Sequence, residues 1–191
     1  MAESPPAIGE LAAERWLATH RDGADPDDVL DFFDSLPTVP TREMLGRWRG
    51  SGLHTGSPLD GLLEAYGWYG KEFLGREAVH PLLFRGRGGR PRAVDPAMLP
   101  LGLLQGYAGL AKLWPVRTTF GRLRPVLYTN QPKARLRTVE HRGVTTAAMI
   151  YDALPIIDVF RRVAEGVVLG AMDMRGLPSP FFFVLERDTA G

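Results

Sequence analysis

The sequence lacks cysteine and carries almost no net charge, and each absence excludes a class of function. With zero cysteines, the chain has no disulfide bond, no thiolate metal ligand and no cysteine nucleophile. Its 23 Lys and Arg residues against 22 Asp and Glu residues leave a net charge of +1. Such a chain has no overall field that attracts nucleic acid, so we expect no nucleic-acid partner.

Long apolar runs are missing as well. No uninterrupted apolar run reaches the roughly 18 residues that predict a transmembrane helix, and the first residues lack the basic and apolar pattern of a secretory signal. We therefore expect a cytoplasmic protein without integral membrane contact. The hydrophobic share of 45% and the charged share of 24% are those of a globular protein with a sizeable core. A homodimer is compatible with this composition.

The familiar signatures of metal, cofactor and hydrolase sites are also absent. The four histidines are His20, His54, His80 and His141, and no two of them have the i, i+4 spacing of a helical metal site. Neither a glycine-flanked serine elbow nor a dinucleotide fingerprint is present. We expect no metal and no cofactor, although a haem held by one histidine stays open, because a single axial ligand leaves no spacing pattern.

The N-terminal segment, residues 1–40, is predicted to be helical. Its second helix is the better marked: Asp25 can cap it, Pro26 suits its first turn, and an apolar stripe follows at Val29, Phe32, Phe33 and Leu36. Pro37 then ends the helix.

The stretch from residue 44 to residue 73 combines two tryptophans and two tyrosines with seven glycines. Residues 46–50 are predicted to be extended, and residues 58–73 are predicted to form a helix with an aromatic stripe. Gly67 and Gly70 inside a helix would need a reason, and we expect close approach of another backbone or of a ligand there. Further on, residues 85–97 are predicted to form a solvated arginine-rich loop, and residues 98–114 a weak helix.

The last third is predicted to form five short strands, separated by glycine and proline turns. Five successive strands leave exposed edges unless they close with earlier strands. The predicted fold class is therefore mainly β (α+β): an antiparallel meander that closes into a small lipocalin-like barrel, with the N-terminal helices packed on it. Residues 41–191 would form this single barrel domain. The five predicted strands are residues 134–142, 144–153, 155–164, 167–175 and 181–187.

Three aspartates stand within the apolar runs of these strands, namely Asp152, Asp158 and Asp173. A carboxylate on an apolar face must be paired, have a raised pKa, or face a wet cavity. One reading is structural, with salt bridges to nearby arginines. The other is that one or two of them line the barrel interior, as a catalytic acid or base or as a polar anchor for a ligand.

Lys71 follows Trp68 by three residues. The lysine either stacks on the tryptophan at the surface or reaches into a cavity beside the ring. If a cavity exists, we expect at least two side chains from one set to face it. That set is Asp152, Asp158, Asp173, Lys71 and Tyr151.

The segment Gly46-Arg47-Trp48-Arg49-Gly50 matches the motif that names the GXWXG family. The later segments "TGSPLDGLLEAYGWYGKEF" and "RLRTVEHRGVTTAAMIYDALPIIDVF" resemble the two modules of that family, here about residues 41–85 and about residues 130–188. The resemblance implies one continuous domain and transfers no activity. By motif position it draws attention to Trp48, Trp68, Tyr69, Lys71, His80, Tyr151, Asp152 and Asp158.

The leading hypothesis is that the barrel binds an apolar small molecule, such as a lipid, polyketide or terpenoid. A second hypothesis is a cofactor-independent cyclase or isomerase, in which Asp152, Asp158 or Asp173 is the general acid. A third is a protein-interaction module. The candidate ligand-binding residues are Trp48, Trp68, Tyr69, Lys71, His80 and Tyr151.

Overall fold

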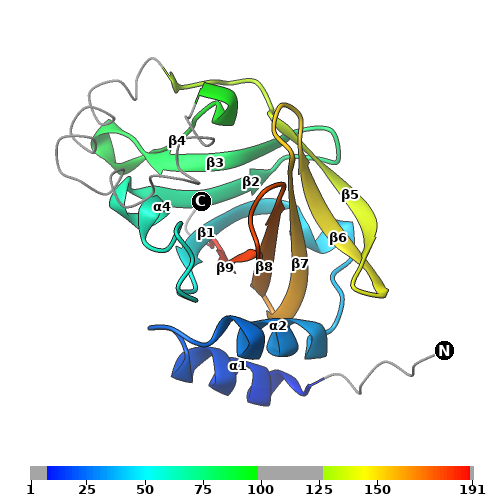
Figure 1. The fold of residues 1–191 in the computed structure, drawn as a ribbon. Coiled ribbons are helices and arrows are strands. Elements are labelled where there is room, and N and C mark those ends of the chain that lie inside the picture. Colours follow the sequence, from blue (N-terminus) through cyan, green and yellow to red (C-terminus); the bar gives the residue numbers. More distant parts are fainter. Residues whose placement is uncertain (1–7, 99–126, 190–191) are drawn as a thin grey trace.

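The protein is an antiparallel β-barrel with two helices packed on its outside (Figure 1). A computed structural model describes residues 8–98 and 127–189, so all of the predicted weak helix except residue 98 lies outside the described residues. The sheet order is β2-β1-β9-β8-β7-β6-β5-β3-β4, and an additional pairing of β2 with β3 closes the ring. The predicted fold class is confirmed.

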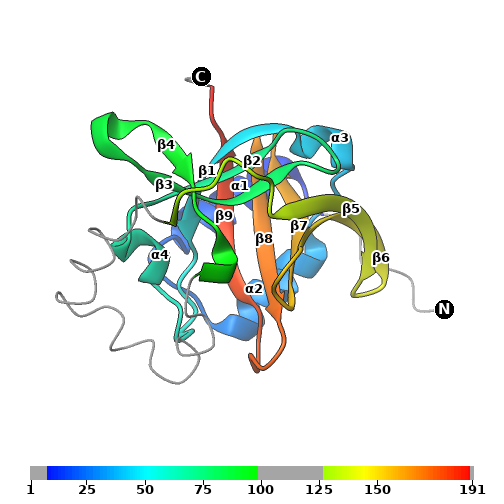
Figure 2. The ribbon, with the colours of Figure 1, turned by 90° about the horizontal axis from the view of Figure 1, so that it is seen from above.

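The strands vary in length, and β4 is a short extra strand beside β3. Seen from above, β5 to β9 curve round one side of the barrel, while β1, β2 and β3 complete the other (Figure 2). The bounds are β1 Gly46–Gly52, β2 Trp68–Phe73, β3 Val79–Arg85, β4 Pro91–Ala93, β5 Ala134–His141, β6 Val144–Tyr151, β7 Ile156–Ala164, β8 Val167–Met174 and β9 Phe181–Arg187.

The C-terminal meander agrees with the predicted strands to within two residues at every end. Tight turns separate the strands because glycine adopts positive φ there: Gly143 has φ +78° and Gly166 has φ +71°. Side chains then alternate between the two faces of the sheet. On β7, Ile156 and Phe160 point into the barrel core, whereas Val159 and Val163 point outward under the helices.

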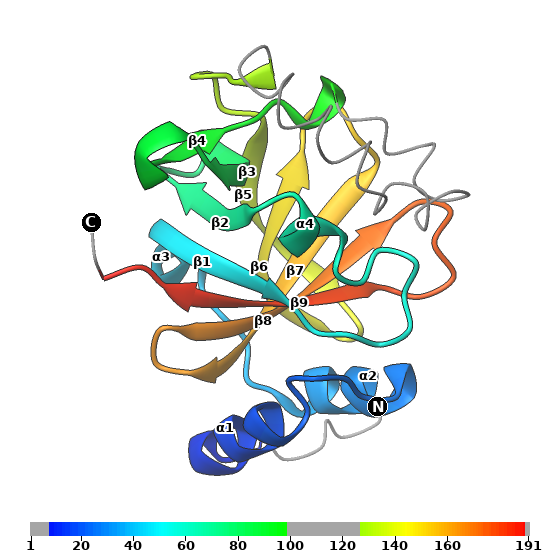
Figure 3. The same cartoon turned by 90° about the vertical axis from the view of Figure 1, so that its left-hand side faces the viewer.

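Helices α1 (Glu10–Thr19) and α2 (Pro26–Ser35) cover the outer face of the sheet (Figure 3). Helix α2 begins as predicted, because the Asp25 side chain accepts a hydrogen bond from the Asp27 amide at 2.9 Å. The two helices bury their apolar stripes against the outward side chains of β7, β8 and β9. The short helices are α3 (Thr41–Met44) and α4 (Leu62–Ala65), with 3-10 turns at Arg87–Gly89 and Pro96–Met98.

None of the described helices has the length and apolar character that crossing a membrane requires.

The predicted helix over residues 58–73 is wrong, because only α4 is helical and Trp68–Phe73 is strand β2. Gly67 and Gly70 adopt φ +72° and +145°, values that end a helix and suit a bulged strand. The expected close approach does occur, but between strands. A Cβ atom on Gly70 would lie 1.9 Å from the Trp48 carbonyl oxygen of the neighbouring strand.

Candidate functional site

An apolar cavity occupies the end of the barrel at which β7 begins and β8 ends. Its volume is about 70 Å³, which is below the range of drug-sized pockets. Helix α4 contributes Leu62 and Leu63 to the wall, and Leu59 lies just before it. Among the described lining residues, Lys71, Tyr151 and Asp158 bring polar groups, whereas the indole N–H of Trp68 donates to the Gly70 carbonyl oxygen. The lining residues are Leu59, Leu62, Leu63, Trp68, Lys71, Leu82, Tyr151, Ile156, Asp158, Met172, Met174, Phe181 and Phe183.

Lys71 enters this cavity because strand β2 is bulged. Its pairing with β3 shifts register between Trp68 and Gly70 and again between Gly70 and Glu72, so Trp68 and Lys71 face the same side despite their odd spacing. Trp68 fits there because β1 has glycine opposite it. A Cβ atom on Gly50 would lie 2.2 Å from the indole ring. The glycines of the motif and of β2 therefore shape the wall of the cavity.

The lysine forms a buried ion pair with Asp158. Lys71 Nζ lies 2.8 Å from Asp158 Oδ2, and the side chains are 3% and 0% exposed. The ammonium also donates to the Pro81 carbonyl oxygen at 3.2 Å and to the Tyr151 hydroxyl at 3.5 Å. Taking two charges out of water is costly, and a pair in an apolar cavity is retained only with good geometry.

Aromatic rings surround the ammonium on several sides. Nζ lies 4.8 Å from the centroid of Phe183, 5.6 Å from that of Trp68 and 5.8 Å from that of Tyr151. Each distance lies within the range in which the negative face of a ring attracts a cation. The cavity therefore stabilises one positive charge at this position by two means, a carboxylate and a cage of rings.

The carboxyl group of Asp158 is not fully satisfied. Its Oδ1 has no hydrogen-bond partner within the described part of the chain. Burial raises the pKa of Asp158 above its usual value, and the attraction of Lys71 opposes this rise without cancelling it. The same burial, together with the charge of Asp158, raises the pKa of Tyr151 well above 10. Tyr151 therefore keeps its hydroxyl proton at neutral pH.

Lys71, Asp158, Tyr151 and Trp68 are thus the predicted site residues that meet at the cavity. The other two aspartates lie elsewhere. Asp152 is exposed and pairs with Arg135 at 2.8 Å, and Asp173 is exposed on the outer side of β8.

The remaining predicted ligand-binding residues do not line this cavity either. Tyr69 donates a hydrogen bond to Asp188 outside the barrel. His80 is buried opposite Glu72 in the register of β2 and β3, and burial lowers its pKa. Trp48 is 2% exposed at the other end of the barrel, where its Nε1 donates to the Met44 carbonyl oxygen at 2.7 Å. Trp48 is therefore a core residue that holds α3 against the barrel.

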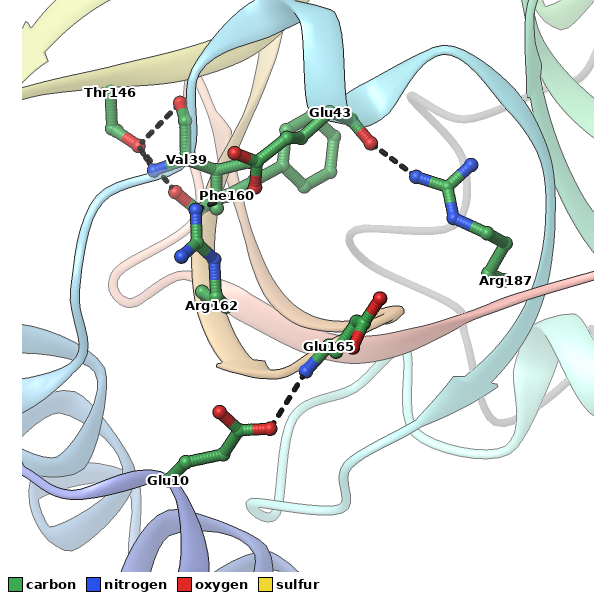
Figure 4. Close-up of polar contacts among 8 residues, drawn as sticks. All are labelled: Glu10, Val39, Glu43, Thr146, Phe160, Arg162, Glu165 and Arg187. Carbon is green, nitrogen blue, oxygen red and sulfur yellow. Dashed lines mark hydrogen bonds and ion pairs between the residues drawn. The ribbon is translucent and has the colours of Figure 1, made fainter.

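Figure 4 shows that other end, where charged side chains surround a second, polar hollow. Arg162 pairs with Glu43 at 2.5 Å, and Arg187 donates to the Glu43 carbonyl oxygen at 2.5 Å. Glu10 of α1 accepts from the Glu165 amide at 3.0 Å. These contacts tie α1 and α3 to the sheet, so the charges there have a structural role.

Met172, Met174, Phe181 and Phe183 are cavity residues that the site prediction missed. They belong to ordinary apolar runs of β8 and β9. The only signal that could have found them is the alternation that places them on the same side as Asp158, once the inner face of β7 is known.

No group of three or more side chains that could hold a metal ion occurs within residues 8–98 and 127–189.

Comparison with known proteins supports the resemblance to the GXWXG family. The GXWXG protein family model matches residues 31–89, and a domain of unknown function, DUF4334, matches residues 132–187. The chain belongs to the GXWXG family. A crystal structure of a protein from Thermomonospora curvata is 36% identical, with a TM-score of 0.68 over 93% of this chain and 99% of that one. The search of curated proteins gave no match.

In this GXWXG protein both module matches contribute to the cavity. Trp68, Lys71 and Leu82 come from the first matched range, and Tyr151, Asp158 and Phe183 come from the second. The ion pair between Lys71 and Asp158 therefore joins the two modules inside one barrel.

Proposed function

We propose that the barrel binds an apolar small molecule with one polar group, which the Lys71–Asp158 pair anchors at the inner wall. The observation that carries this proposal is Oδ1 of Asp158, which lies in a mostly apolar cavity and has no hydrogen-bond partner among the described residues. A buried acceptor without a donor costs about 1–3 kcal/mol. A ligand hydroxyl that donates to Oδ1 would recover this cost, while its apolar chain would contact the leucines, methionines and rings of the wall.

The apolar lining of the cavity supports a ligand of this kind. The cavity volume of about 70 Å³ is below the range of drug-sized pockets, so a lipid, polyketide or terpenoid would place only part of its apolar chain inside and extend through the opening. Tyr151 would add specificity, because its hydroxyl keeps its proton and can donate to a ligand oxygen. Helix α4, with Leu62 and Leu63 on the wall, would contact the apolar part of the ligand.

Displacement of a fluorescent hydrophobic dye by 1-decanol and by decane tests the proposal. A hydrogen bond to a charged acceptor contributes about 1.5–3 kcal/mol, so decanol should bind at least about tenfold more tightly than decane. The preference should weaken in Asp158→Asn, whose amide oxygen is an uncharged acceptor, and persist in Asp152→Asn, the matched control at an exposed aspartate. Equal affinities of the wild type for both compounds, or no displacement by either, would contradict the proposal.

A second candidate function is acid-catalysed cyclisation or isomerisation in the same cavity, with Asp158 as the acid. The raised pKa of Asp158 favours it, because a carboxyl group with a raised pKa is better suited to donate a proton to an alkene or epoxide. The rings around Lys71 Nζ would stabilise a developing cation. Incubation with a terpenoid epoxide distinguishes the two functions. Product that forms in Asp152→Asn and not in Asp158→Asn, at unchanged substrate affinity, would establish the enzyme.

A further inference from the structure

Lys71 is unusual because a primary amine lies inside an apolar cavity that a ligand could enter. The amine is 3% exposed and is a lining residue of the cavity. Amines held in apolar pockets form Schiff bases with carbonyl compounds.

We propose that Lys71 forms a reversible covalent imine with an apolar aldehyde or ketone bound in the cavity. This inference rests on the proposed function and names the chemical class of the ligand, a carbonyl compound with an apolar chain. The carbonyl carbon would lie at Nζ, and the chain would extend along the wall formed by Met172, Phe181 and Phe183.

Asp158 supplies the proton transfers that this reaction needs. The Lys71 ammonium first gives a proton to the carboxylate 2.8 Å away, and the free amine then forms the C–N bond to the carbonyl carbon. The carbonyl oxygen receives a proton from Asp158 and becomes a hydroxyl, while the nitrogen returns a proton to Asp158. In the last step Asp158 protonates the hydroxyl, the C–O bond breaks and one water leaves.

The product is a protonated imine beside a carboxylate, with the same net charge as the initial ammonium and carboxylate. No external oxidant or reductant is consumed. The ion pair and the rings at 4.8–5.8 Å from Nζ stabilise the iminium as they stabilise the ammonium. Because Oδ1 of Asp158 has no hydrogen-bond partner in the part of the chain that the structure describes, this carboxyl oxygen is available to the hydroxyl of the carbinolamine.

Reductive trapping tests this inference on the unmodified protein. The chain has three lysines, Lys71, Lys112 and Lys133, so peptide mapping resolves every side-chain amine and the N-terminal amine. With decanal and cyanoborohydride, Lys71 should gain one decyl group at least about tenfold faster than Lys133, whose Nζ pairs with Asp95 near the surface. An excess of 1-decanol should slow the labelling of Lys71 and leave that of Lys133 unchanged.

Labelling of Lys71 no faster than that of Lys133, or insensitive to decanol, would overturn the imine. Binding of decanol without preferential labelling would overturn the imine and leave the proposed function intact. Failure of both decanol binding and labelling would overturn both. A comparison of Asp158→Asn with Asp152→Asn then tests the proton transfers. Lys71 should be labelled at least about tenfold more slowly in Asp158→Asn than in the wild type, and at the wild-type rate in Asp152→Asn. Equal labelling rates in the two variants would show that Asp158 takes no part in the reaction.

Discussion

Replacement of Lys71 by methionine should make the stability of the protein depend steeply on pH. The substitution keeps the volume of the side chain and removes the cation beside a carboxyl group that is 0% exposed. Breaking a buried pair in this way costs about 3–5 kcal/mol at neutral pH. Burial already raises the pKa of Asp158, and Lys71 opposes that rise, so the pKa of Asp158 in the variant should rise further.

The sign of the pH dependence follows from this raised pKa. Below the unfolded pKa, about 3.9, Asp158 is protonated in both states and contributes no penalty. Above it the unfolded chain releases the proton and the folded protein keeps it, so the free energy of unfolding falls by about 1.4 kcal/mol per pH unit. The loss ends at the folded pKa.

Urea unfolding followed by tryptophan fluorescence measures this effect, with Lys71→Met/Asp158→Asn as the control. The single and the double variant differ only in one carboxyl group, so the difference between their unfolding free energies isolates Asp158. We expect that difference to change by about 1.4 kcal/mol per pH unit. Parallel curves for the two variants would refute the reasoning, since Asp158 would then ionise as easily in the folded protein as in the unfolded chain.

Three further predictions concern the packing of the barrel and the start of helix α2. Gly50→Ala should lower the free energy of unfolding by about 1–3 kcal/mol, because the new Cβ would lie 2.2 Å from the Trp68 ring. Urea unfolding measures this loss, and an unchanged urea midpoint would be inconsistent with that contact. Trp48→Ala should cost roughly 3–5 kcal/mol as a truncation of a 2% exposed core residue, and an unaltered melting temperature would argue against this role. Asp25→Ala should cost about 0.5–2 kcal/mol, whereas Asp25→Asn, which keeps a capping oxygen, should restore most of it in the same melt.

The C-terminal meander could be predicted from sequence because its turns are marked locally. Gly143 and Gly166 take positive φ in the structure, and each stands between two runs of strand-forming residues. Closure of the barrel could also be predicted, since a five-stranded meander leaves edges that must be paired. The ends of these five strands were predicted to within two residues.

Strand β2 could not be predicted, because its bulge imitates helical spacing. Trp68, Lys71 and Phe73 are all buried, and the gap of three between the first two is what a helix would produce. The register shifts against β3 depend on Gly70 and on the neighbouring Trp48 carbonyl. This contact joins two strands, and the residues of β2 alone do not reveal it.

The site was predictable only in part for a similar reason. Alternation correctly grouped Asp158 with Ile156 and Phe160, and Asp173 with Leu169 and Ala171. Both faces of β7 and β8 are apolar, however, because one faces the barrel interior and the other lies under α1 and α2. Which face is the interior is a property of the whole fold, so the sequence could not select Asp158 from the three aspartates.

The most direct test of the central claim is a crystal structure of the protein with 1-decanol at saturation. We expect the alkyl chain to lie among Leu62, Met172 and Phe183, with the hydroxyl oxygen about 2.5–3.0 Å from Asp158 Oδ1. Decanol bound only elsewhere, for example in the polar hollow beside Arg162 and Arg187, would contradict it. So would a saturated complex in which side chains fill the space around Lys71 and Asp158 and exclude the ligand.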